Sequence, residues 1–383
     1  MEISARARSG SAIDRLVSHP RLPLIAGREA DRSAVQVRDG LLRELAVLGA
    51  GSPPYGDLFH RMTPEVAWHP HEAMLAVSDA DGIALWTPEG VTPVPGIAQD
   101  PHGCRALAFS PDGRTLWADG WDCSSALDLA SGTVATAAGW DTGVTAPPGG
   151  GLVSTLISEQ AETLVVFATA GTDRPAVMRP LRRALHLDVD DYRPPDFSAD
   201  GRHFAISGNA YDNTLEVFAF PSLTRVAALA LGEPHPGSCS PLEDAWVEQM
   251  QTWARPAATF GSVPGVLWIG TPAGILIEYR VDGGRLIEHP VATSAVTALT
   301  ATATGHLVVA LGDGDLMLVR EPPGPPASGA EEVAAAFGRA TEHAPDETDE
   351  DDEDPYGGRF DFAGAGALPW TRVRASGNVV GGR

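Results

Sequence analysis

The chain has 383 residues, of which 43% are hydrophobic, so it is long for one domain and can bury a substantial core. Its 50 acidic residues outnumber the 27 basic ones, which gives a formal net charge of −23, and every one of those 27 is arginine. An acidic surface of this kind repels nucleic-acid phosphates and anionic lipids. We therefore expect neither nucleic acid nor a membrane as a partner.

The first residues and the cysteines bear on the compartment. The N-terminal segment contains two early arginines but no apolar stretch, so no secretory signal is expected. No uninterrupted apolar run approaches the ~20 residues that span a bilayer. Cys104, Cys123 and Cys239 are irregularly spaced, which favours packed thiols in a reducing cytosol. With the lack of lysine and abundant alanine and glycine, this predicts a cytoplasmic protein of a GC-rich bacterium.

A repeated strand pattern runs along the chain, and its clearest copies are residues 106–120 and 195–208. Each copy has a short apolar strand, then Ser-x-Asp-Gly, then a second apolar strand. The Asp-Gly pair suits a tight turn because glycine reaches positive φ at little steric cost. Two degenerate copies begin at Ile13 and Glu65 and have His-Pro in the turn. A third strand follows in each unit and a fourth in most.

The repeat predicts a closed ring of sheets. Seven units begin near residues 11, 65, 104, 142, 192, 252 and 294, close to the roughly 40–50-residue repeat of a β-propeller. The last unit supplies only three strands before Glu321, and residues 2–7 can supply its fourth, which would remove exposed sheet edges. We predict an all-β fold: one propeller of seven four-stranded blades over residues 1–321. A pair of β-sandwiches is the disfavoured alternative.

The turns at residues 110–114 and 198–202 are similar to those of the WD-repeat and TolB-like β-propeller superfamily. The Trp-Asp pair that names WD repeats is largely lost, since Arg38-Asp39 and Leu127-Asp128 keep only the aspartate. The resemblance implies a propeller over about 320 residues. It leaves the activity open, because such propellers include binding modules, hydrolases and lyases.

An insertion between the fifth and sixth units predicts a helix. Residues 240–243 read as an N-cap followed by proline and acid in the first turn. Trp246, Met250 and Trp253 then fall at i, i+4 and i+7, on one helical face. This face either packs on the propeller rim or binds a partner protein.

The C-terminal residues 322–383 differ in composition from the rest. A proline-rich linker precedes residues 331–340, which can form one or two helical turns, and eight of the nine residues from Asp346 to Asp354 are acidic. We predict a largely disordered acidic tail. It either only aids solubility, docks on the propeller, or tethers a partner through Phe360, Phe362 and Trp370, because aromatic residues dominate interfaces.

The sequence contains no recognisable chemical motif: no P-loop, no Gly-x-Ser-x-Gly and no Gly-x-Gly-x-x-Gly. His69 and His71 flank a proline in a predicted turn and are expected at the surface. Four aspartates lack the EF-hand spacing and are expected to be solvated loop carboxylates: Asp188, Asp190, Asp191 and Asp196. The ring could bring four histidines together: His102, His186, His203 and His306. We expect no catalytic residue, no metal site and no cofactor.

These features favour a non-catalytic protein–protein interaction scaffold of a bacterial multiprotein system, present as a monomer within a hetero-complex. The alternative is a hydrolase, lyase or small-ligand binder with its site in the central channel. Histidine and acidic side chains clustered at the channel mouth would favour the alternative, and a channel lined by alanine, valine and serine would favour the scaffold. A third possibility is that the acidic run imitates nucleic acid towards a basic partner.

Overall fold

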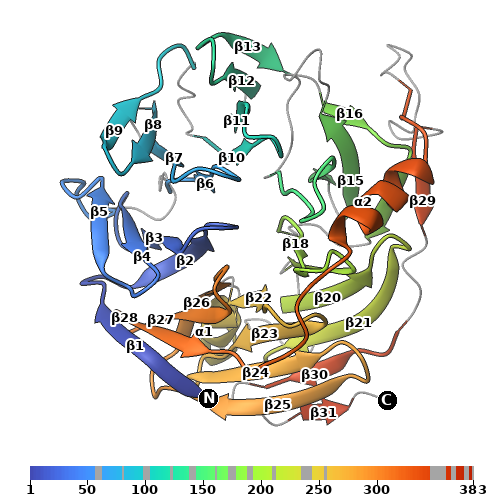
Figure 1. Cartoon of the computed structure of the whole chain (residues 1–383). Coiled ribbons are helices and arrows are strands. Elements are labelled where there is room, and N and C mark those ends of the chain that lie inside the picture. Colours follow the sequence, from blue (N-terminus) through green and yellow to red (C-terminus); the bar gives the residue numbers. More distant parts are fainter. Residues whose placement is uncertain are drawn as a thin grey trace.

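Seven sheets stand around a central axis in the computed structural model of the protein, which confirms the seven-bladed propeller (Figure 1). The structure describes residues 1–56, 63–79, 82–97, 104–120, 124–137, 144–159, 162–170, 178–187, 193–208, 213–233, 244–253, 257–345, 359–363, 368–374 and 379–381. We number the blades 1 to 7 along the chain. In the described residues, no helix is long and apolar enough to cross a membrane.

Blades 1 to 3 are four-stranded antiparallel meanders. Blade 1 comprises β2 (Ile13–Ser18), β3 (Leu24–Glu29), β4 (Val35–Asp39) and β5 (Glu44–Leu48). Blade 2 comprises β6 (Val66–Trp68), β7 (Leu75–Asp79), β8 (Gly82–Thr87) and β9 (Gly90–Pro93). Blade 3 comprises β10 (Ala106–Phe109), β11 (Thr115–Asp119), β12 (Ser124–Asp128) and β13 (Val134–Ala137).

Blades 4 to 6 follow in the same direction around the ring. Blade 4 comprises β14 (Val153–Glu159), β15 (Glu162–Ala170), β16 (Met178–Pro180) and β17 (Arg183–Leu187). Blade 5 comprises β18 (Asp196–Phe197), β19 (His203–Gly208), β20 (Asn213–Ala219) and β21 (Thr224–Leu231). Blade 6 comprises β22 (Ala258–Phe260), β23 (Val266–Gly270), β24 (Ile275–Arg280) and β25 (Arg285–Pro290).

Blade 7 closes the ring with strands from both ends of the propeller. Its chain-sequential strands are β26 (Val296–Ala301), β27 (His306–Leu311) and β28 (Asp315–Arg320), and β1 (Glu2–Arg8) pairs antiparallel with β28. The register sets Ile3 opposite Val319 and Ala7 opposite Leu316. The predicted closure by the N-terminal strand is therefore confirmed.

The strands are apolar on both faces where blades pack on each other. In β27 the five residues Leu307–Leu311 are all buried, whereas all four residues of the outer strand β9 are exposed. This difference explains why inner strands read as continuous apolar runs, as expected of sheets covered on both sides. The Asp-Gly turns form as predicted, since Gly113 and Gly201 have φ of 75° and 67°.

Blade 4 departs from the regular meander. Thr145 bridges Ser154 of β14, so a short segment takes the place of an innermost strand, and the fourth strand is split into β16 and β17 at Leu181 and Arg182. The proline and glycine content of this unit accounts for its weak repeat signal, because neither residue extends a strand well.

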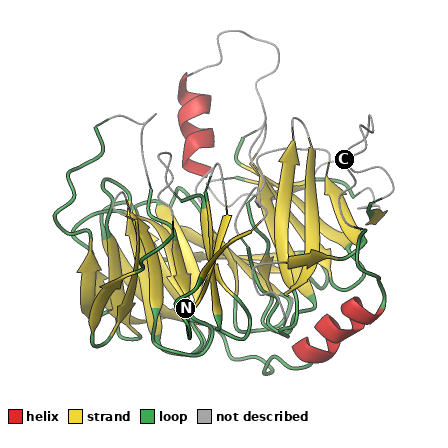
Figure 2. Ribbon diagram, turned by 90° about the horizontal axis from the view of Figure 1, so that it is seen from above, coloured by secondary structure: helices red, strands yellow, loops and turns green. Residues whose placement is uncertain are grey.

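Two helices lie on opposite faces of the ring (Figure 2). The predicted insertion helix is α1 (Asp244–Trp253), which joins blades 5 and 6. The tail forms α2 (Ala330–Arg339), longer than the one or two turns predicted, and it contributes Phe337 to the core between blades 4 and 5.

The tail also adds strands to two blades. The segment β29 (Asp361–Ala363) pairs parallel with β17 of blade 4, and β30 (Thr371–Val373) pairs parallel with β21 of blade 5. A last strand, β31 (Val379–Gly381), pairs with β30. The acidic run Asp346–Asp354 lies outside the described residues. In its described parts, the tail is docked on the propeller.

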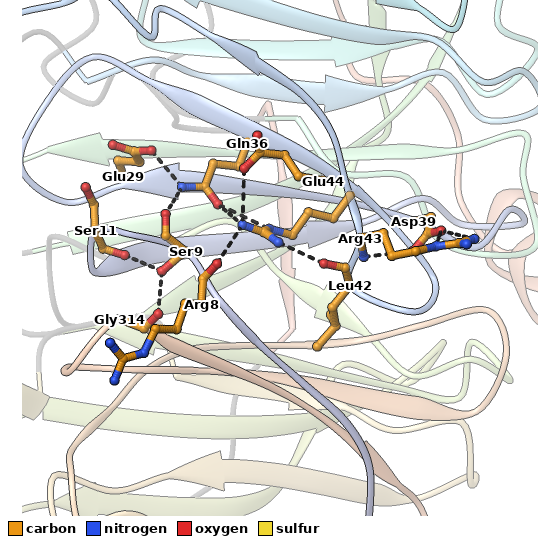
Figure 3. A network of polar contacts seen from close by, with 11 residues as sticks. Arg8, Ser9, Ser11, Glu29, Gln36, Asp39, Leu42, Arg43, Glu44 and Gly314 are labelled. Carbon is orange, nitrogen blue, oxygen red and sulfur yellow. Dashed lines mark hydrogen bonds and ion pairs between the residues drawn. The ribbon is translucent and has the colours of Figure 1, made fainter.

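A buried polar network joins the closing strand to blade 1 (Figure 3). The amide of Gln36 donates to the Ser9 carbonyl oxygen and to Glu29 Oε1, both at 2.7 Å. The Arg38 guanidinium donates to Gln36 Oε1 at 2.7 Å, to the Leu42 carbonyl at 2.8 Å and to the Arg8 carbonyl at 3.2 Å. Because Arg8 and Ser9 end β1, the network fixes where the ring closes.

Candidate functional site

A cavity of about 1550 Å³ occupies the centre of the ring. Every blade contributes to its wall, and Trp253 at the end of α1 lines it as well. The wall mixes apolar side chains such as Leu16 and Leu299 with hydroxyl groups such as Thr300 and with charged residues. It therefore matches neither a channel of small apolar residues nor a mouth of clustered histidines and acids.

Four charged residues of the cavity wall pair with one another across blades 1 and 2. The Arg28 Nε atom lies 2.8 Å from Asp14 Oδ1, and its Nη1 atom lies 3.4 Å from Glu65 Oε1. Arg15 also pairs with Glu65. Burial lowers the pKa of Arg28, but the Asp14 and Glu65 carboxylates outweigh it and the net shift is upward. With two charges of each sign, this quartet joins neighbouring blades.

Asp196 is the carboxylate of the cavity wall with the most unusual environment. Its Oδ2 atom, at the start of β18, accepts the Phe260 amide hydrogen at 2.9 Å, which links blade 5 to blade 6. Burial raises the pKa of Asp196 to about 6, although bonds from Phe260 and Thr259 oppose the shift. A carboxylate that titrates near neutrality inside a cavity is suited to acid–base chemistry or to binding a cation.

Replacing Asp196 by asparagine tests this environment. The folded pKa of about 6 lies above the unfolded value of about 3.9, so ionisation costs the fold stability as pH rises from about 4 to 6. The full cost is at most about 3 kcal/mol, because the partly exposed carboxylate is also screened by solvent. In urea denaturation, we expect the free energy of unfolding of Asp196→Asn to equal that of the wild type near pH 4 and to be higher than that of the wild type at pH 7.5. The same change in the free energy of unfolding at both pH values would contradict the raised pKa.

The structure corrects two expectations about single residues. Asp196 was expected to be a solvated loop carboxylate, but it begins a strand and bonds across blades; Asp188, Asp190 and Asp191 lie outside the described residues. His69 was expected at the surface, but it is buried.

His69 and the equivalent His19 build the turns that lack Ser-x-Asp. In each, Nδ1 accepts two backbone N–H groups of its own turn, from Arg21 and Leu22 or from His71 and Glu72. The other ring nitrogen, Nε2, then donates to a carbonyl of the next blade, that of Glu72 or of Gly113, at 2.8 and 3.0 Å. Burial lowers the pKa of His19, in keeping with this neutral ring. The residues are therefore inter-blade connectors.

The described residues hold no group of three or more histidines, cysteines or carboxylates able to bind a metal. Three of the four histidines that the ring could bring together are described, and they form no such group: His186 pairs with Glu162 at 2.8 Å, His203 is partly buried, and His306 contacts Thr304. His102 lies outside the described residues. Of the cysteines, only Cys104 is described, and burial raises the pKa of its thiol to about 12, which disfavours the reactive thiolate.

The three residues predicted on one face of α1 differ in their surroundings. Trp253 is buried among core residues of blades 5 and 6. Met250 and Trp246 are partly buried; the Met250 carbonyl accepts from Asn213, and the Trp246 indole donates to Glu233. The C-terminal end of the helix thus packs against blades 5 and 6. A partner-binding role for this face stays a prediction.

The three aromatic residues predicted to bind a partner through the tail also differ in their burial. Phe360 is buried against Leu164, Val166 and Ala184 of blade 4. Phe362 and Trp370 remain 45% and 40% exposed on the outer edges of blades 4 and 5. Sequence reasoning missed the edges that receive them, because a parallel strand of three residues leaves no periodic pattern.

The chain is thus a seven-bladed β-propeller, and described segments of its C-terminal tail pair with the outer strands of blades 4 and 5. No protein-family model matches the chain, and no curated protein does so either.

Proposed function

We propose that this protein is a non-catalytic interaction scaffold of a bacterial cytoplasmic assembly and a divergent relative of WD-repeat and TolB-like propellers. The observation that supports this best is the seating of its own tail, since β29 and β30 each extend a blade through a main-chain ladder. Such ladders recognise extended polypeptide generally, and side-chain pockets add specificity. A rigid ring that displays such edges suits the binding of several proteins at once.

The rest of the rim offers further apolar anchors. Leu41 and Leu45 on blade 1 and Val91 on blade 2 are 61%, 49% and 54% exposed. They lie in the turn before β5, in β5 and in β9, which form the outer edges of neighbouring blades. Exposed apolar side chains on adjacent sheet edges favour protein partners over nucleic acid.

The test is quantitative capture from a GC-rich bacterial lysate, using the full chain as bait. A chain ending at Glu321 is unsuitable because it removes Phe337 from the core. Instead, the variant Leu45→Glu/Val91→Glu is compared with the matched control Glu89→Gln, at an exposed position in the turn before β9. We expect a purified partner to bind the wild type and the control alike and to bind the rim variant at least tenfold more weakly. If no protein binds specifically to the full chain, the scaffold proposal fails.

A second candidate, a hydrolase, lyase or small-ligand binder, is favoured by one observation: the raised pKa of Asp196 in the central cavity. Under this alternative, a metabolite panel stabilises the wild type against heat and Asp196→Asn abolishes that shift. Under the scaffold proposal, Asp196→Asn leaves the affinity for the captured partner unchanged.

A further inference from the structure

We infer that the outer edge of β17 is a docking site for an extended segment of a partner protein with the pattern aromatic–acidic–aromatic, and that residues Arg359–Ala363 are its exchangeable resident. This inference rests on the proposed function and narrows it to one edge and one partner chemistry. Four features support it: the backbone ladder, the side-chain pockets, the small area of contact and the length of the preceding chain.

The backbone ladder is independent of sequence. The register pairs Arg183 with Asp361, Ala184 with Phe362 and Leu185 with Ala363, all in parallel. The Asp361 amide also donates to the Arg182 carbonyl at 2.6 Å. Any extended segment can supply these main-chain groups, so the edge is a general acceptor of strands.

Side chains give the edge a preference for particular residues in the docked segment. Phe360 fills a recess against Leu164, Val166 and Ala184 and is only 6% exposed. The Arg182 guanidinium holds the Asp361 carboxylate through two contacts, at 3.2 and 3.3 Å.

The second aromatic ring lies at the border of the site. The ring of Phe362 lies 5.6 Å from that of His186. It also borders a hollow of about 470 Å³ that is lined by the edge and by residues 340–342, which follow α2. A segment with an aromatic ring, an acid and a second ring therefore fits.

The resident is weakly held compared with the rest of the tail. Only three residues form β29, and Asp361 and Phe362 are both exposed. An exposed ion pair such as that of Asp361 contributes roughly 0–1 kcal/mol. In contrast, Phe337 of α2 is completely buried. The edge can therefore lose its resident while α2 stays in place.

The chain geometry permits this exchange. The segment before the acidic run is tied to the same edge, because the Arg182 amide donates to the Glu342 carbonyl and the Ala344 amide donates to the Pro180 carbonyl, both at 2.8 Å. Thirteen residues, 346–358, separate this anchor from Arg359. At roughly 3.3–3.6 Å per residue, they can span up to about 45 Å. Residues 359–363 can thus leave without disturbing the anchor.

Because residues 359–363 already occupy the edge of β17, a partner segment must compete with them. A tethered segment has an effective concentration of roughly 1 mM. If the segment binds in trans with a Kd of about 10–100 µM, the tether weakens a competitor by roughly 10- to 100-fold. A partner therefore needs a tighter segment or a second contact elsewhere on the rim.

The experiment uses the full chain and a fluorescent peptide with the sequence of residues 357–365. The variant Phe360→Ser/Asp361→Ser vacates the edge, and Trp370→Ser, in the tail segment on blade 5, serves as the matched tail control. We expect the vacated variant to bind the peptide 10- to 100-fold more tightly than the wild type. Adding Arg182→Glu should weaken that binding roughly three- to fivefold, and a peptide with arginine at the Asp361 position should restore it.

Four outcomes would overturn the inference. Equal affinity of the wild type and the vacated variant would mean that the peptide binds elsewhere or not at all. Failure of the charge-reversed pair to restore binding would remove Arg182 from the site. A wild-type dimer in sedimentation that the vacated variant loses would identify a second copy, not a partner protein, as the occupant. A captured partner that binds every variant equally refutes this edge alone and leaves the scaffold proposal intact.

Discussion

Replacing Phe337 by alanine is expected to lower the free energy of unfolding by about 3–5 kcal/mol. The ring is completely buried between blades 4 and 5, with ring centroids 4.7 Å from Phe167 and 4.8 Å from Phe220. Its removal leaves a cavity that these aromatic neighbours cannot fill by small movements. Urea denaturation followed by intrinsic fluorescence measures the loss.

The matched control is Phe362→Ala, which makes the same chemical change in the same tail. Its ring is 45% exposed, so we expect a loss below about 1 kcal/mol. Similar losses for both variants would mean that α2 is not part of the cooperatively folded propeller. The expected difference would instead place residues 330–340 in the structural core.

The repeat was predictable because blades 3 and 5 repeat the same local chemistry. Ser110 and Asp112 illustrate this: the serine hydroxyl bonds Asp112 Oδ1 at 2.6 Å and accepts the Thr115 amide at 3.0 Å, which closes the turn. Ser198 and Asp200 repeat the arrangement. Local bonds of this kind leave a sequence signature, and the apolar strands on either side set the register.

Other features could not be predicted because they depend on contacts between distant segments. The burial of His19 and His69 in their turns depends on the next blade, which supplies a carbonyl for Nε2. The raised pKa of Asp196 results from burial against blade 6. The docking of Phe360 depends on a recess formed by blade 4, nearly two hundred residues earlier in the chain.

The surfaces and the interior of this propeller have different tasks. Inside, charges such as those of Arg28 and Glu65 are paired across blades and hold the ring. Outside, the edges of blades 4 and 5 carry strands of the tail. An exchangeable strand on a rigid rim lets a binding event alter the tail without altering the ring, because the blades are fixed by their own ladders.

Replacing Arg38 by methionine is expected to lower the free energy of unfolding by about 2–5 kcal/mol, because two buried acceptors lose their donor. The side chain is buried, and burial lowers the pKa of Arg38 although Glu44 and Glu29 oppose the shift. Methionine would leave Gln36 Oε1 and the Leu42 carbonyl without this donor at the closure of the ring. We expect a lower midpoint in urea and faster proteolysis of β1.

The control lies in the turn that follows β4. Arg43 pairs with Asp39, but its side chain is 74% exposed, so Arg43→Met should cost less than about 1 kcal/mol. The double variant Arg38→Met/Gln36→Leu tests the network itself, since Gln36 links Arg38 to Glu29 and Ser9. A coupling energy above about 1 kcal/mol would show that the two residues act together in closing the ring. Strict additivity would mean that Arg38 and Gln36 contribute independently. A loss below about 1 kcal/mol for Arg38→Met alone would mean that the ladder with β28 holds β1 and that the buried arginine does not secure the closure.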